Sequence, residues 1–127
     1  MILKEFNDYV EAYHQELQSI SEFLARPIPD DPVCIAEDLR WCASHRHRAG
    51  VHFGMFLQFQ KDCMVDAWPD EGAATQRQVM AEGEIAPIIA MRKIWENNID
   101  CLREKGHNCR KLLSQAASEL QQGRDIT

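Results

Sequence analysis

The sequence has few of the features that mark membrane, secreted or nucleotide-binding proteins. Its densest apolar stretch, residues 85–91, falls well short of the ~18 residues that a membrane span needs. The first residues lack the basic segment and apolar run of a secretion signal. A glycine-rich phosphate loop, a nucleophile elbow and a Cys-x-x-Cys pair are all missing. We therefore expect no membrane association and no cofactor.

The number of cysteines and the distribution of charge bear on the cellular location and on the kind of binding partner. Five cysteines at irregular spacing, without a secretion signal, predict reduced thiols and a cytoplasmic location. The 127 residues are 45% hydrophobic and 27% charged, which is typical of one folded domain. The net charge is −6, but residues 92–111 carry +3 and the remainder −9. An acidic protein is a poor general binder of nucleic acid, although a local basic face can meet phosphate or an acidic partner.

One apolar pattern organises the chain between residues 35 and 67. Its positions alternate in steps of four and three, which is the spacing of a heptad seam on a helix. Such a helix would run roughly 50 Å, too long to be covered by a compact chain of this size, so a helix of similar length must lie along it. The seam positions are Ile35, Leu39, Cys42, Arg46, Ala49, Phe53, Phe56, Gln60, Cys63 and Ala67.

Proline and glycine mark the ends of the other helices. We predict helices at about 3–25, 32–67, 75–82 and 84–122, with proline-containing breaks after residue 26 and after residue 67. Around Gly83 and Pro87 two alternatives stay open: a kinked helix, or a short helix followed by a new one. The seam of the last helix continues in phase across Gly106, which favours one continuous helix over a break there.

These patterns predict an all-α fold. Two long helices of matching length, joined by a short connection, should form an elongated antiparallel hairpin with the first helix packed on it as a third member. We expect a coiled-coil-like bundle that forms oligomers, because the first helix covers only about two-thirds of the hairpin. Residues 75–87 or another copy of the chain would shield the rest.

Four polar residues interrupt the seams. They are predicted to fix helix register and oligomer state, as polar residues at core positions of coiled coils do. Arg46 is expected on the buried seam, paired with an acidic residue across the hairpin. The four positions are Arg46, Gln60, Asn98 and Lys105.

The stretch 42–52 allows two chemical alternatives to this structural interpretation. His45 and His52 share a helix face and are possible metal ligands, although residues 42–52 contain no His-x-x-x-His or Glu-x-x-His pair. Arg46 followed by His52 resembles the Arg…His motif of HEPN-type ribonucleases, which are helical bundles of similar size. The structural interpretation is favoured, so we expect no metal site and no catalytic residues.

A basic stripe on the last helix is the candidate functional surface. Three of its residues, Arg92, Arg103 and Arg110, fall within about 20° of one another on the helix, opposite the apolar seam. Lys93 and Lys111 lie on the same side. The stripe is predicted to bind a protein partner, through phosphate or carboxylate contacts. A solvated face and a weak nucleic-acid binding surface are the alternatives.

Two segments resemble a known group of proteins. Met80-Ala81-Glu82-Gly83-Glu84 and the stretch from Trp95 to Arg103 are similar to a pattern in small helical proteins encoded by tailed phages among early genes. The resemblance implies a phage or prophage protein that acts in the bacterial cytoplasm without assigned enzymatic residues. Together with the seams it predicts a non-enzymatic interaction module that acts on a host or phage protein of DNA metabolism or defence.

Overall fold

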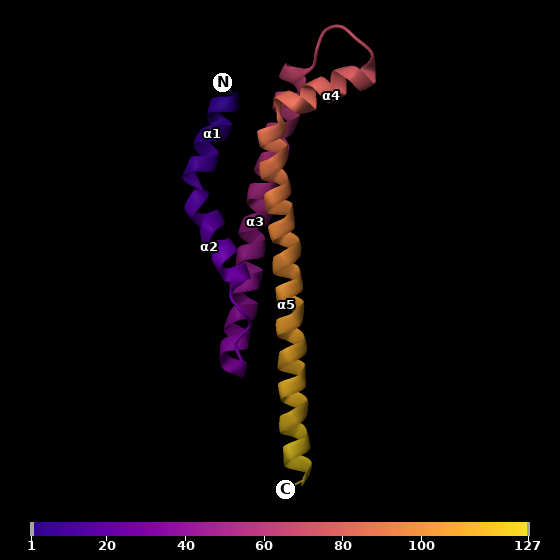
Figure 1. Cartoon of the computed structure of the whole chain (residues 1–127). Coiled ribbons are helices and arrows are strands. Elements are labelled where there is room, and N and C mark those ends of the chain that lie inside the picture. Colours follow the sequence, from indigo (N-terminus) through magenta and orange to yellow (C-terminus); the bar gives the residue numbers. More distant parts are fainter. Residues whose placement is uncertain (1, 127) are drawn as a thin grey trace.

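The computed structural model of the chain describes the backbone of residues 2–126 and the side chains of residues 3–123. The fold is all-α, as predicted, and these residues contain no strand. Figure 1 shows an elongated arrangement dominated by two long helices that lie side by side. The helices are α1 (Ile2–Ala12), α2 (His14–Ala25), α3 (Pro32–Ala67), α4 (Ala74–Glu84) and α5 (Ala86–Ile126).

Helices α3 and α5 form the predicted antiparallel hairpin. Their mutual contact is the most extensive in the chain, and Figure 1 shows them running in opposite directions. Helix α5 continues through Gly106 without a break, as its seam predicted. It also extends beyond the predicted end at about residue 122, to Ile126.

Local chemistry explains where the long helices begin. Oδ2 of Asp31 accepts a hydrogen bond from the backbone N–H of Cys34 at 3.2 Å, and Pro32 occupies the first turn of α3. Gly72 adopts a φ of 113° in the connection after α3, a conformation that favours glycine. Near Gly83 the second alternative holds, because α4 ends at Glu84 and α5 opens at Ala86 with Pro87 in its first turn.

The predicted first helix is two helices. The break lies at Tyr13, where the backbone leaves helical geometry with φ −111° and ψ 14°. The backbone of α1 lies closest to α3 and that of α2 lies closest to α5, although side chains of α2 such as Glu16 also contact α3. Figure 1 shows the resulting bend between α1 and α2.

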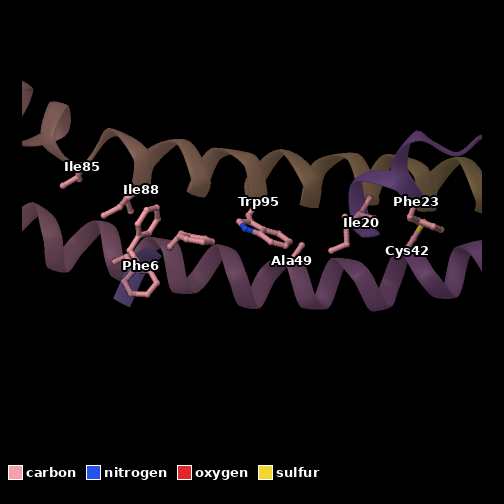
Figure 2. Close-up of a cluster of buried hydrophobic side chains, with 11 residues drawn as sticks. Phe6, Ile20, Phe23, Cys42, Ala49, Ile85, Ile88 and Trp95 are labelled. Carbon is pink, nitrogen blue, oxygen red and sulfur yellow. The ribbon is translucent and has the colours of Figure 1, made fainter. Parts of the chain in front are cut away.

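The core follows the seam between α3, α5 and the N-terminal helices (Figure 2). On α5 the predicted seam is confirmed, since every buried side chain from Ile88 to Cys109 falls on it except Gly106. Both polar seam residues of α5, Asn98 and Lys105, are buried. The largest fully buried side chains are Trp95, Phe56, Ile20, Ile88, Leu102, His52 and Cys109.

On α3 the seam prediction is wrong at one position. Arg46 is exposed, so it does not interrupt the core, and it forms no ion pair among the described side chains. The packed face of α3 is wider than one seam because it meets α1 and α2 as well as α5. It therefore includes a second series, each member one residue before a predicted seam position. That series is Asp38, His45, His52 and Phe59.

Helix α5 continues past the end of α3 that carries Pro32, as Figure 1 shows. We call this the open end of the hairpin, and the α3–α4–α5 connection the closed end. Within residues 2–126, none of the helices combines the length and apolar character needed to cross a bilayer.

Candidate functional site

Side chains of α3 and α5 line a small groove around Gly106, which we call the arginine groove. It includes three arginines, Arg46 from α3 and Arg103 and Arg110 from α5, and has a volume of about 40 Å³. This space admits a group such as a carboxylate or a phosphate and leaves the rest of a ligand outside. The other lining residues are Leu39, Cys42, Ala43, Leu102 and Gly106.

Gly106 explains why the groove forms at this point. A β-carbon built there would lie 3.5 Å from Cβ of Cys42 and 3.8 Å from Cδ1 of Leu39, so the two helices approach closely. Arg103 and Arg110 stand three residues before and four residues after this glycine, which places them on its helix face. The missing side chain therefore leaves a hollow flanked by guanidinium groups.

The charges at the groove are weakly compensated. Within the described part of the chain, Arg46 and Arg110 have no ion pair, and both are exposed. Arg103 lies 3.5 Å from Oδ1 of Asp100, with both side chains more than half exposed. Such a pair contributes little and is readily exchanged for a stronger acceptor.

The structure divides the predicted basic stripe. Arg103 and Arg110 join Arg46 at the groove, whereas Arg92 lies 4.0 Å from Glu96, about 16 Å further along α5. Lys93 and Lys111 are exposed and do not line the groove. The convergence of Arg46 with the α5 arginines was missed from the sequence, because Arg46 was assigned to the core.

Lys105 lies in a buried polar cluster on the α2 side of α5. Its ammonium group donates to the backbone carbonyls of Phe23 and Arg26, the second at 2.9 Å, and lies 3.9 Å from the centroid of the Phe23 ring. Burial lowers the pKa of Lys105. The buried carboxylate of Asp38 is 2.9 Å from Arg26. Lys105 thus holds the end of α2 against the hairpin.

A second buried network surrounds His52, which the sequence offered as a possible metal ligand. His52 is fully buried, with Nδ1 2.6 Å from the hydroxyl of Tyr9 and Nε2 3.0 Å from Oε2 of Glu16. Arg48 donates two hydrogen bonds to Glu16, at 2.7 and 3.1 Å. The ring of Trp95 covers the imidazole at a centroid distance of 4.4 Å. The network fastens both N-terminal helices to α3.

The charge of Glu16 makes this network sensitive to acid. Hydrogen bonds from Arg48, and secondarily from His52, hold the pKa of Glu16 below its ordinary value of 4.5. Its ionised form therefore stabilises the fold at pH values above 4.5, and this contribution is lost as the pH falls through the lower folded-state pKa.

We expect Glu16→Gln to be less stable than the parent near neutral pH, with a difference that shrinks on acidification below about pH 4.5. Urea unfolding of both proteins across this range checks the prediction, and a difference independent of pH would contradict it.

The structure does not bring together the residues on which the metal-site and ribonuclease alternatives for residues 42–52 depend. Arg46 lines the arginine groove, whereas His52 contacts Tyr9, Glu16 and Trp95. His45 packs between the rings of Phe23 and Trp41. Among the described side chains, no three of His, Cys, Asp or Glu come close enough together to hold a metal ion.

The buried thiols have the character of packing residues. Burial is the largest cause that raises the pKa of Cys42, to about 11, and it also raises that of Cys109. A thiol with a raised pKa is a poor nucleophile at neutral pH.

The arginine groove is an exposed hollow at which basic side chains from two separate helices meet, and two of its three arginines have no ion pair within the described residues. Asp38, Lys105 and His52 lie inside the fold and hold helices together. Comparison of the chain with protein-family models, curated proteins and solved structures finds no match.

Proposed function

We propose that this protein is a non-enzymatic interaction module that binds an acidic surface of a partner protein through the arginine groove. The observation that carries the proposal is the convergence of Arg46, Arg103 and Arg110, from two helices, on one exposed hollow. Two of the three have no ion pair in the described structure. Unpaired arginines that share a hollow are suited to bidentate contact with a carboxylate.

The charge of the whole chain favours a protein partner over nucleic acid. The net charge is −6, so a polyanion approaching the groove would meet long-range repulsion from the rest of the molecule. A partner protein that presents a few carboxylates on an otherwise neutral or basic surface would not meet this repulsion.

The resemblance to small tailed-phage proteins supports the proposed setting. We place the module in the cytoplasm of a bacterial host, where its partner is a host or phage protein of DNA metabolism or defence. We also propose that it self-associates, with Gln60, Asn98 and Lys105 contributing to the choice of register. Gln60 and Asn98 support this in part, because each has a buried amide atom without a hydrogen-bond partner in the described structure.

Charge reversal at the groove tests the proposal. Arg46→Glu combined with Arg110→Glu should reduce capture of the partner from host extract by at least about tenfold, because two attractive contacts become repulsive. Lys4→Glu combined with Lys61→Glu is the matched control, since it makes the same charge change at two exposed lysines away from the groove. Quantitative mass spectrometry of proteins bound to each immobilised variant is the measurement.

The control and a nuclease step make each outcome decisive. A protein that is retained by the control variant and lost by the groove variant supports the proposal. Equal capture by both variants would remove the groove from the interaction. Loss of capture after nuclease treatment would show that the ligand is nucleic acid, and the protein-partner proposal would then be wrong.

A further inference from the structure

Among the residues that the structure describes, no other helix lies beside the last part of α5. Gly106 lies against Leu39 and Cys42, and α3 begins only seven residues before Leu39, at Pro32. Seven residues counted forward from Gly106 for Leu39, and ten for Cys42, end the antiparallel pairing between residues 113 and 116. Figure 1 shows α5 continuing well beyond the start of α3. We call residues 117–126 the overhang.

An apolar seam runs into the overhang. Cys109 is fully buried against α3, Leu113 and Ala116 are half-buried, and Leu120 is 66% exposed. These four residues keep the heptad spacing of the hairpin, so the face that packs on α3 continues past its end. A short helical segment with an uncovered apolar seam is only marginally stable in water, which favours a partner for it.

The closed end of the hairpin carries a complementary feature, which we call the apolar groove. It has a volume of about 290 Å³ and is formed by the end of α3, the start of α5 and the start of α1. Leu3 stands at its edge, 57% exposed. The lining residues are Leu3, Cys63, Asp66, Ala67, Glu84, Ile85, Pro87 and Ile88.

We propose that the overhang of one copy seats in the apolar groove of the next copy, so that the chains assemble head to tail. The overhang extends the face of α5 that packs on α3, and the groove lies where the hairpin's own interface ends. Leu120 is the side chain we place in the groove. The contact thus continues an interface that the fold already makes within one chain.

The apolar contact of Leu120, and not charge, sets the direction of assembly. Arg110 and Lys111 precede the overhang, but Glu119 lies within it, and Asp30 and Asp31 stand beside the start of α3. The apolar groove is lined by Asp66 and Glu84 together with its apolar side chains. Burial of Leu120 among these apolar side chains is therefore what joins the copies.

This geometry predicts an open series of oligomers. The overhang and the apolar groove lie at opposite ends of an elongated molecule. We place the copies end to end, so that each contact extends the row along the helix axes, and a heterologous contact repeated in this way does not close. The contact is small, and we expect assembly at concentrations of about 10 µM to 1 mM. The assembly rests on the self-association in the proposed function but does not use the arginine groove as a contact surface.

Complementing variants test the proposal. Leu120→Asp disables the overhang, Leu3→Asp disables the apolar groove, and each should remain monomeric in sedimentation or light scattering. Their equimolar mixture should form dimers and nothing larger, because each variant supplies one intact surface. Val51→Asp is the matched control on an apolar side chain that is 43% exposed in the middle of α3, and it should assemble like the parent. Circular dichroism verifies that all variants keep the fold.

The results distinguish head-to-tail assembly from a monomer and from a closed dimer. A parent protein that stays monomeric up to about 1 mM would overturn the proposal. So would a closed dimer in the parent, or assembly of Leu120→Asp to the same size as the parent. All of these variants keep Arg46 and Arg110, so partner capture through the arginine groove is measured independently of assembly.

Discussion

Lys105→Ala is expected to lower the free energy of unfolding by about 3 kcal/mol. The substitution removes the buried donor of the carbonyls of Phe23 and Arg26 at the end of α2. It also leaves the carboxylate of Asp38, which is only 5% exposed, with one cationic neighbour fewer. Unsatisfied carbonyls and an undercompensated buried charge both favour the unfolded state, where water replaces the lost contacts. Urea denaturation with a two-state fit measures the change.

Two further variants distinguish the contribution of the Lys105 ammonium group to stability from that of its aliphatic chain. Lys105→Met retains most of the packing and should still cost about 2 kcal/mol, because only the charged hydrogen-bond donor is lost. Lys111→Ala, an exposed lysine on the same helix, should stay within about 0.5 kcal/mol of the parent. A Lys105→Met protein as stable as the parent would show that the buried ammonium adds no net stability.

His52→Ala should cost about 3–5 kcal/mol, for a different reason. The imidazole is fully buried and packs against Trp95, so its removal leaves a cavity beneath the N-terminal helices. It also deprives the Tyr9 hydroxyl of its acceptor and Glu16 of one of its neighbours. The same denaturation experiment reports the change, and a smaller cooperative unit would appear as a reduced dependence on urea.

Neighbouring variants apportion this loss. Tyr9→Phe removes one hydrogen bond without a cavity and should cost about 1 kcal/mol. His47→Ala, an exposed histidine on the same helix, should be nearly neutral. If His52→Ala were as stable as His47→Ala, the network around Glu16 would not be what fastens α1 and α2 to the hairpin.

The seam of α5 could be predicted from the sequence because this helix presents one packed face. The positions of its three-four pattern from Ile88 to Cys109 are buried or partly buried, including the polar residues Asn98 and Lys105. The same regularity carried the pattern correctly across Gly106. Past Cys109 the pattern continued but the neighbouring helix did not, and this could not be inferred from spacing alone.

Helix α3 was harder to interpret because it has neighbours on two sides. A strict heptad reading chose Arg46 for the core, whereas the packed face also includes His45 and His52, one residue before predicted positions. A signal was present, since Asp38, His45, His52 and Phe59 recur every seven residues. It was not recognised because three of these residues are polar, and their partners come from α1 and α2.

Only the part of the arginine groove that lies on α5 could be predicted from the sequence. The alignment of Arg103 and Arg110 follows from helical geometry alone. Their meeting with Arg46 depends on the register between α3 and α5, which is fixed by the close approach at Gly106. Register between helices is a tertiary property, so the sequence indicated a stripe on one helix where the structure has a groove between two.

A double-mutant cycle on Arg46 and Arg110, measured as affinity for the captured partner, tests most directly whether these side chains form one site. Arginines that bind the same acidic group should be coupled by at least about 0.5 kcal/mol, so the double alanine variant should differ from the sum of the single variants. Arg46 and Arg92, which are not neighbours, should instead be additive within about 0.3–0.5 kcal/mol. Additive losses at Arg46 and Arg110, with an equal loss at Arg92, would show that the arginines act as a diffuse basic face and would contradict the groove.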